Sequence, residues 1–276
     1  MIQLKQINLM SFLKKTILGA ILIPATALAQ NSNKYQEPHR PLVHYTPERG
    51  WMNDPNGMIY FKGLYHLFHQ YTPFQNVPDF SKMHWGHAVS KDLIHWEELA
   101  PALVNDEHGA IFSGSAVVDV NNTSGFAKNG ETPIVAIFTH NNSELEKSGS
   151  DRFQSQSLAY SLDEGKTWIK YQGNPVLPNP GIRDFRDPKV MWYAPQKKWI
   201  MSLATLDHIT FYSSSDLKNW TEESKFGKGI GAHGGVWECP DLFPLYYEGR
   251  EIWILVVSLN PGGPNGGAGT QYFTGN

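Results

Sequence analysis

Short apolar runs separated by turn residues recur along the chain, and they predict alternating long and short β-hairpins. The long hairpins pair two runs of β-favouring residues, and they are predicted over residues 56–71, 113–141, 188–205 and 240–259. The short hairpins combine a strand, an Asp-containing turn and a second strand opened by Trp, over residues 88–99, 159–171 and 212–223. A short hairpin follows each of the first three long ones, which predicts a repeated unit of four antiparallel strands.

This repetition is typical of a β-propeller, in which every blade is one four-stranded sheet. A β-sandwich is the alternative, but it does not explain why Asp92, Asp163 and Asp216 each shortly precede a Trp in the short hairpins. Three complete repeats and the opening hairpin of a fourth are visible. We therefore expect an all-β propeller whose chain stops within the fourth blade, at "GTQYFTGN".

The composition agrees with an all-β fold and excludes one class of partner. The 276 residues include 13% aromatic residues, 25 Gly and 18 Pro, which favour short strands and tight turns over long helices. The formal net charge is −3, and no basic stripe with interleaved aromatic residues occurs, so nucleic acid is not expected as a partner. Cys239 is the only cysteine, so no intrachain disulfide can form.

The first 29 residues have the pattern of a signal peptide. Lys5, Lys14 and Lys15 precede the apolar run "TILGAILIPATALA", which ends in small residues before Gln30. A membrane anchor is the alternative, but the run is shorter than the roughly 20 apolar residues that a membrane span needs, and Pro24 interrupts it. We expect export to the periplasm or the medium, no membrane association after cleavage, and a folded domain over residues 30–276.

Four sequence blocks stand at or just before the first strand of each repeat, and they bring candidate chemistry with them. They read "WMNDPNG", "IFSGS", "FRDPKV" and "WECPDLF", and they contain Asp54, Asp187 and Glu238. Taken singly, Asp54 and Asp187 before proline could be turn residues and Glu238 a surface residue. The first strand of every blade lines the central channel of a propeller, so the three acids are expected to converge.

Aromatic residues near these blocks, Trp51, Trp85, Phe112 and Trp237, would provide the apolar walls of a sugar-binding pocket. Paired carboxylates that act as nucleophile and general acid are the apparatus of glycoside hydrolysis. Asp54, in a turn rich in backbone N–H and amide donors, suits the ionised role. Glu238, flanked by Trp237 and Cys239, is expected in a less polar setting that suits proton transfer.

The four blocks, in this order, resemble those of glycoside hydrolase family 32, the invertases, inulinases and levanases, and the resemblance covers about residues 40–276. It implies a five-bladed propeller that cleaves terminal β-D-fructofuranosidic bonds in levan, inulin and sucrose with retention of configuration, without a cofactor or metal. By the same resemblance, Asp54 would be the nucleophile, Asp187 the transition-state stabiliser and Glu238 the acid/base. The resemblance also implies a fructosyl subsite lined by Asn53, Gln70, Trp85, Phe112, Ser113 and Arg186.

The chain departs from the family pattern in two places. His69 in "HLFHQ" stands where an aromatic residue is usual, and the fifth blade and C-terminal β-sandwich of family members are not visible in the sequence. A non-catalytic fructan-binding propeller and a fructosyltransferase stay open as alternatives, since acceptor choice depends on subsites that no motif defines.

Two further patterns look functional at first sight. His66 and His69, like His84 and His87, have the spacing His-x-x-His, but residues three apart on a strand face opposite sides, which argues against a shared metal ion. The glycine-rich run 260–270 lacks Gly-Lys-Ser/Thr and opens no helix, so it is interpreted as a loop and not as a phosphate site.

Overall fold

The structure, a computed structural model, describes residues 35–41 and 43–275. The chain divides into two compact units, Met1–Arg40 and Pro41–Asn276. In the first unit the described residues are 35–40, where Arg40 forms an ion pair with Glu37 at 2.7 Å. The predicted signal peptide, residues 1–29, lies outside the described residues. No helix in the described part of the chain is long and apolar enough to cross a membrane.

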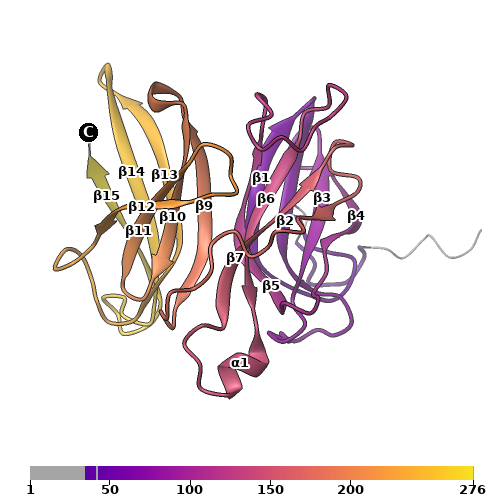
Figure 1. Cartoon of the computed structure of the whole chain (residues 1–276). Coiled ribbons are helices and arrows are strands. Elements are labelled where there is room, and N and C mark those ends of the chain that lie inside the picture. Colours follow the sequence, from indigo (N-terminus) through magenta and orange to yellow (C-terminus); the bar gives the residue numbers. More distant parts are fainter. Residues whose placement is uncertain (1–34, 42, 276) are drawn as a thin grey trace, which may run out of the picture. The chain divides into compact units, whose positions relative to one another are not determined.

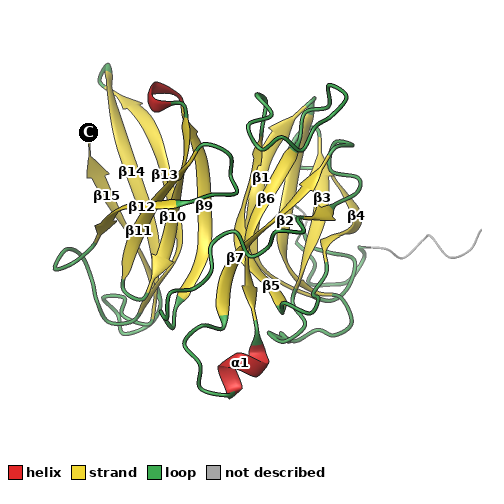
Figure 2. Cartoon of the chain, viewed as in Figure 1, coloured by secondary structure: helices red, strands yellow, loops and turns green. Residues whose placement is uncertain are grey.

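The second unit is built from strands in four antiparallel sheets (Figures 1 and 2). The first sheet contains β1 (Trp51–Phe61), β2 (Leu64–Thr72), β3 (His84–Ser90) and β4 (Trp96–Leu103). The second contains β5 (Ala110–Val118), β6 (Ile134–Asn141), β7 (Gln154–Ser161) and β8 (Ile169–Lys170). The third contains β9 (Phe185–Tyr193), β10 (Lys198–Thr205), β11 (His208–Ser214) and β12 (Thr221–Phe226). The fourth contains β13 (Val236–Tyr247), β14 (Arg250–Asn260) and β15 (Gly269–Gly275).

Helical structure among the described residues is limited to two short pieces (Figure 2). The helix α1 (Ser143–Lys147) follows β6, and the 3-10 turn η1 (Ala194–Gln196) joins β9 to β10. In every sheet the strands pair in chain order, which is the repeated unit that the sequence pattern predicts. The all-β, propeller-like arrangement is confirmed, and β15 adds a third strand to the predicted opening hairpin of the fourth sheet.

The innermost strands β1, β5, β9 and β13 pack side by side in that order. Buried apolar side chains form three layers, each shared by two neighbouring sheets. Phe68 and Phe138 belong to the layer between the first and second sheets, Ile137 and Met201 to the next, and Val257 to the last. The core therefore lies between the sheets, and it holds the innermost strands around a common channel.

The recurring Asp-to-Trp turn has one structural explanation in all three sheets. A serine hydroxyl at the end of the third strand donates to the Asp carboxylate, and the carboxylate accepts backbone N–H groups of the turn. The Trp indole N–H then donates to a backbone carbonyl of the same turn. These indole bonds run from Trp96 to Leu93 at 3.2 Å, from Trp168 to Gly165 at 3.0 Å and from Trp220 to Leu217 at 2.9 Å.

Candidate active site

Each of the four innermost strands carries a β-bulge at its sequence block. At each bulge two consecutive residues face a single residue of the neighbouring strand: Asn53 and Asp54 face Gln70, Phe112 and Ser113 face Thr139, Asp187 and Pro188 face Leu203, and Cys239 and Pro240 face Val257. A bulge re-aims side chains and breaks the alternation of a regular strand. Neighbouring residues can therefore both reach the channel, although they would point apart in a flat strand.

These bulges correct one detail of the sequence interpretation. The sequence predicts a turn over "WMNDPNG" before its strand, but the block lies within β1. Its turn-forming residues serve the bulge instead, because a bulge needs the same local departures from extended backbone that a turn does. The backbone at Asp187 and Cys239 is left-handed, with φ of +63° and +46°. Asp54 and Asp187 thus lie within their bulges, and Glu238 lies directly before its bulge. The three acids therefore do not occupy identical positions in their strands.

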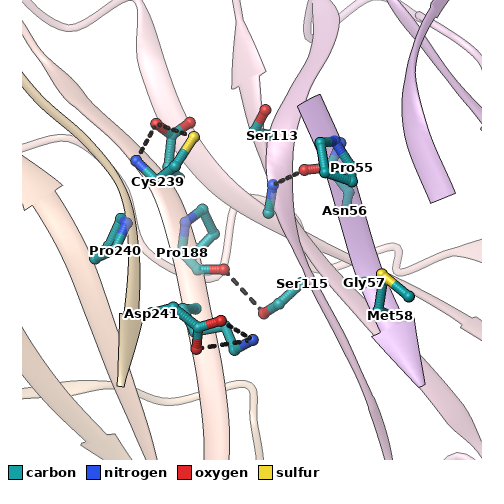
Figure 3. Close-up of a pocket in the computed structure, with 13 residues that line it drawn as sticks. Pro55, Asn56, Gly57, Met58, Ser113, Ser115, Pro188, Cys239, Pro240 and Asp241 are labelled. Atoms are coloured by element: carbon teal, nitrogen blue, oxygen red, sulfur yellow. Dashed lines mark hydrogen bonds and ion pairs between the residues drawn. The ribbon is translucent and has the colours of Figure 1, made fainter. Parts of the chain in front are cut away.

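A cavity of about 240 Å³ lies between the four innermost strands (Figure 3). Its lining includes Ser113, Asp187 and Cys239, and also Lys189 and Asp241, which form an ion pair at 3.0 Å. All four sheets contribute to this lining, so it is the channel that the propeller interpretation requires.

Asp54 is held by a chain of two hydrogen bonds. The Gln70 side-chain amide donates to the Ser113 hydroxyl at 2.6 Å, and this hydroxyl donates to Asp54 Oδ2 at 2.6 Å. Ser113 and Gln70 are 2% and 4% exposed, so their mutual bond is buried, whereas the bond to the partly exposed Asp54 is partly buried. Asn53, the remaining predicted residue of this block, is exposed beside Asp54. A hydroxyl donor at this distance fixes the orientation of the Asp54 carboxyl group.

Asp187 is a buried acid, with 7% of its surface exposed. Its Oδ2 accepts the backbone N–H of Cys239 at 3.0 Å. Burial raises the pKa of this carboxyl to about 6, and the charges of Asp54 and Glu238 act in the same direction, against the opposing effects of Arg186 and of the Cys239 N–H. Asp187 therefore carries a charge at neutral pH only at a cost in free energy.

Arg186 connects the acids of the third and fourth sheets. Its guanidinium donates to Glu238 Oε1 at 2.7 Å and to Asp184 Oδ1 at 2.5 Å, and its Nε lies 4.0 Å from Asp187 Oδ2. These carboxylates raise the pKa of Arg186 further above its ordinary value, against the effect of burial, so the side chain stays charged. The expected less polar setting of Glu238 is therefore wrong, because an arginine faces it.

The Cys239 thiol lies between two of the acids. Its sulfur is 3.7 Å from Asp54 Oδ2 and 3.6 Å from Asp187 Oδ2, so one S–H group serves two carboxylates. Cys239 keeps an exposed face, but the packing around its sulfur and the nearby charges of Asp187, Asp54 and Glu238 raise the pKa of the thiol. The thiol therefore stays protonated and can donate to either acid. Sequence reasoning identified Cys239 only as part of the surroundings of Glu238.

Two of the predicted wall residues belong to the core. Trp85 and Trp237 are both completely buried, because each fills the layer between its own sheet and a neighbouring one. Trp85 lies beneath the site, where its indole N–H donates to the backbone carbonyl of Phe112 at 3.0 Å. Trp51 and Phe112 are partly exposed and stay available as wall residues.

The two predicted His-x-x-His pairs do not face a common site. His66 instead bonds across the sheet to His87, with Nδ1 and Nε2 3.1 Å apart. Within residues 35–41 and 43–275, no group of three or more His, Cys, Asp or Glu side chains could hold a metal ion.

Comparisons with known proteins identify the family of the chain. Residues 44–276 match the model of the glycosyl hydrolases family 32 N-terminal domain. The chain is 55% identical over 253 residues to a levanase of Bacillus subtilis, covering 91% of this chain and 36% of the levanase. It is 45% identical over 282 residues to an extracellular exo-inulinase of Aspergillus niger, covering 94% of this chain and 52% of that protein.

Among solved structures, a fructofuranosidase of Schwanniomyces occidentalis complexed with fructose superposes with a TM-score of 0.80 at 42% identity, covering 89% of this chain and 48% of that one. The chain thus spans between about a third and about half of the length of these relatives. The match extends from residue 44 through all four bulged blocks, and by this measure the chain belongs to glycoside hydrolase family 32.

Proposed function

We propose that the protein hydrolyses terminal β-D-fructofuranosidic bonds in fructans and sucrose with retention of configuration. The observation that carries this proposal is the convergence of Asp54, Asp187 and Glu238. The Cys239 thiol lies within hydrogen-bonding distance of both Asp54 and Asp187. Arg186 donates to Glu238 and lies 4.0 Å from Asp187. The relatives named levanase and exo-inulinase support the substrate class.

In this mechanism Asp54 attacks the anomeric carbon of the terminal fructosyl unit, and Glu238 protonates the departing oxygen. Arg186 occupies Glu238 Oε1, so Oε2 is the oxygen that carries the transferred proton. A water molecule then cleaves the fructosyl–Asp54 ester, and Glu238 accepts its proton. Ser113 orients Asp54 for attack, and its hydrogen bond is released to the extent that negative charge leaves the carboxylate.

Asp187 takes the role of a stabiliser in this proposal. Hydroxyl groups of the sugar can donate to its carboxylate, and these bonds strengthen as positive charge develops on the ring. Asn53 and Phe112 complete the fructosyl subsite, whereas the buried Gln70 and Trp85 act on it indirectly, Gln70 by holding Ser113 and Trp85 by holding Phe112.

The decisive experiment combines product analysis with variants. The full-length protein is incubated with sucrose, inulin and levan, and the products are identified by chromatography, which separates a hydrolase from a fructosyltransferase by whether free fructose or longer chains accumulate. Asp54→Asn and Glu238→Gln should each lower kcat by orders of magnitude without unfolding the protein. Near-normal turnover of the Asp54 variant, or binding of fructan without turnover by the unaltered protein, would overturn the proposal.

We also propose the finer architecture and location that the sequence suggests. A fourth strand beside β15 and a fifth blade would complete a five-bladed catalytic domain that begins at about residue 30, as the three complete four-stranded sheets and the length of the relatives support. The pattern of residues 1–29 and the relative named extracellular support export. The N-terminal sequence of the secreted protein tests the cleavage site.

A further inference from the structure

The turn between β10 and β11 connects the two sequence blocks that carry Arg186 and Glu238. The backbone N–H of Leu206 in this turn donates to the carbonyl of Asp184 at 2.9 Å, and its carbonyl accepts the N–H of Trp237 at 2.8 Å. The Asp184 carboxylate accepts a hydrogen bond from Arg186, which in turn donates to Glu238, the residue after Trp237. These contacts form a closed ring, so the Leu206 backbone fixes the position of one block relative to the other.

The segment that leads into Glu238, residues 227–235, has a backbone with few restraints of its own. Five of its nine residues are glycine, which leaves the chain free to adopt many conformations. Contacts with neighbouring side chains must therefore hold the segment in one conformation. Because Trp237 and Glu238 follow directly, the position of this segment affects the position of the acid/base candidate.

His233 connects this segment to the turn and to Trp237. Its Nδ1 lies 2.9 Å from Asp207 Oδ2, and its Nε2 lies 3.1 Å from the carbonyl oxygen of Ile230. Both partner atoms are acceptors, so a protonated ring, which has two N–H groups, satisfies both. The ring also stacks on the indole of Trp237, with centroids 5.3 Å apart and an interplanar angle of 23°. One side chain thus contacts the turn, the glycine-rich segment and the residue before Glu238.

Asp207 is suited to hold this histidine. It follows Leu206 in the turn, and its other carboxylate oxygen, Oδ1, lies 3.8 Å from His208 Nδ1. Burial acts to raise the pKa of Asp207, but the hydrogen bond from His233 and the charges of both histidines bring this pKa below its ordinary value. Asp207 is therefore an ionised acceptor at neutral pH, and hydrogen bonds to ionised acceptors are stronger than those to neutral ones.

We propose that Asp207 and His233 are positioning residues for Glu238. The proposal deepens the proposed function and rests on it, since Glu238 is the group that protonates the departing oxygen. A general acid must lie within hydrogen-bond reach of this oxygen, and a misplacement of about 1 Å can lower the rate about 100-fold. Without the Asp207–His233 contact, the glycine-rich segment and Trp237 lose an anchor, and Glu238 is held less closely in its reactive position.

The pair should matter only for bonds whose cleavage needs a proton. Sucrose releases glucose through an oxygen that Glu238 must protonate, whereas the fluoride of β-D-fructofuranosyl fluoride departs as an anion with the electron pair of the C–F bond. In both reactions the Asp54 carboxylate, oriented by Ser113, forms the ester bond to the anomeric carbon. A displaced Glu238 therefore slows the first reaction and leaves the second unchanged.

The test measures kcat/KM of the full-length protein and its variants, because this ratio reports the formation of the ester for both substrates. His233→Ala and Asp207→Ala should each lower kcat/KM for sucrose about tenfold and change kcat/KM for the fluoride less than about twofold. Asp207→Asn keeps an acceptor oxygen for His233 and should lose less than Asp207→Ala. Because the two alanine variants remove the same contact, the double variant should lose no more than the larger of the two single losses.

His95→Ala is the matched control. His95 also pairs with an aspartate, with its Nδ1 2.7 Å from Asp92 Oδ2, but it lies in the turn between β3 and β4 of the first sheet. The control should leave kcat/KM for both substrates unchanged. Equal losses for sucrose and the fluoride in the His233 and Asp207 variants, or additive losses in the double variant, would indicate a general effect on the fold and overturn the positioning role.

The same measurements separate this inference from the proposed function. Unchanged kcat/KM for sucrose in the variants of an active enzyme overturns the positioning role and leaves the proposed function standing. An unaltered protein that hydrolyses neither sucrose, nor fructans, nor the fluoride overturns the proposed function, and the positioning role with it.

Discussion

Replacing Asp187 by asparagine should stabilise the domain at neutral pH while it removes a carboxylate of the site. The pKa of Asp187 is raised from 3.8 to about 6, mainly by burial. Between these two values the folded protein holds a proton that the unfolded chain has released. An ionised Asp187 at pH 7 therefore lowers the free energy of unfolding by about 3 kcal/mol.

Asparagine keeps the shape and an acceptor oxygen for the Cys239 N–H, but it carries no charge to desolvate. A gain of about 3 kcal/mol corresponds to a rise in Tm of about 6 to 12 °C for a domain of this size. The gain should be largest above pH 6, should decline as the pH falls, and should vanish below about pH 4, where Asp187 is protonated in both states.

The assay is thermal and urea unfolding of both proteins across this pH range, with kcat measured alongside. Asp241→Asn is the control, because its ion pair with Lys189 is partly exposed and its loss should change stability by less than about 1 kcal/mol at any pH. A variant that is no more stable than the unaltered protein at pH 7.5, or a difference that does not depend on pH, would refute the reasoning.

Three further outcomes follow from the contacts of the site and its surroundings. Ser113→Ala breaks the chain from Gln70 to Asp54 and should lower kcat on sucrose by about tenfold or more, since a hydrogen bond to a charged group contributes about 1.5–3 kcal/mol; unchanged kcat would exclude a role for this hydroxyl. Cys239 should react with iodoacetamide at pH 8 more slowly than glutathione does, because its thiol pKa is raised; a faster reaction would contradict that direction. Burial lowers the pKa of His87 to about 3, so between pH 6.5 and pH 3 the unfolded chain binds a proton that the folded protein does not. The free energy of unfolding should therefore fall as the pH falls through this range, and His87→Gln should reduce this acid sensitivity in equilibrium unfolding.

The repeated sheets could be predicted from the sequence because their signals are local. The turn that joins the third and fourth strands closes on its own side chains, such as Asp92 and Trp96, and needs no partner from another sheet. The short apolar runs on either side of the turn then assign the flanking strands. The convergence of the acids followed from the topology alone, since first strands line the channel of a propeller.

The bulges and the burial of aromatic side chains could not be predicted in the same way. Asn53 and Asp54 are compatible with a turn and with a bulge, and the pairing with β2 decides between the two. Whether Trp85 lines a pocket or fills the core depends on the packing of two sheets far apart in sequence.

The layered core ties catalytic geometry to packing far from the acids. Asp54, Asp187 and Glu238 stand on the first, third and fourth sheets, so the distance between nucleophile and acid/base candidates is set across all three apolar layers in series. Small shifts in the packing of one sheet on the next therefore add up along the series of sheets. A substitution such as Ile137→Val, buried in the middle layer, would therefore change the spacing between the sheets that carry the acids. A screen for altered turnover should include core positions that no substrate ever touches.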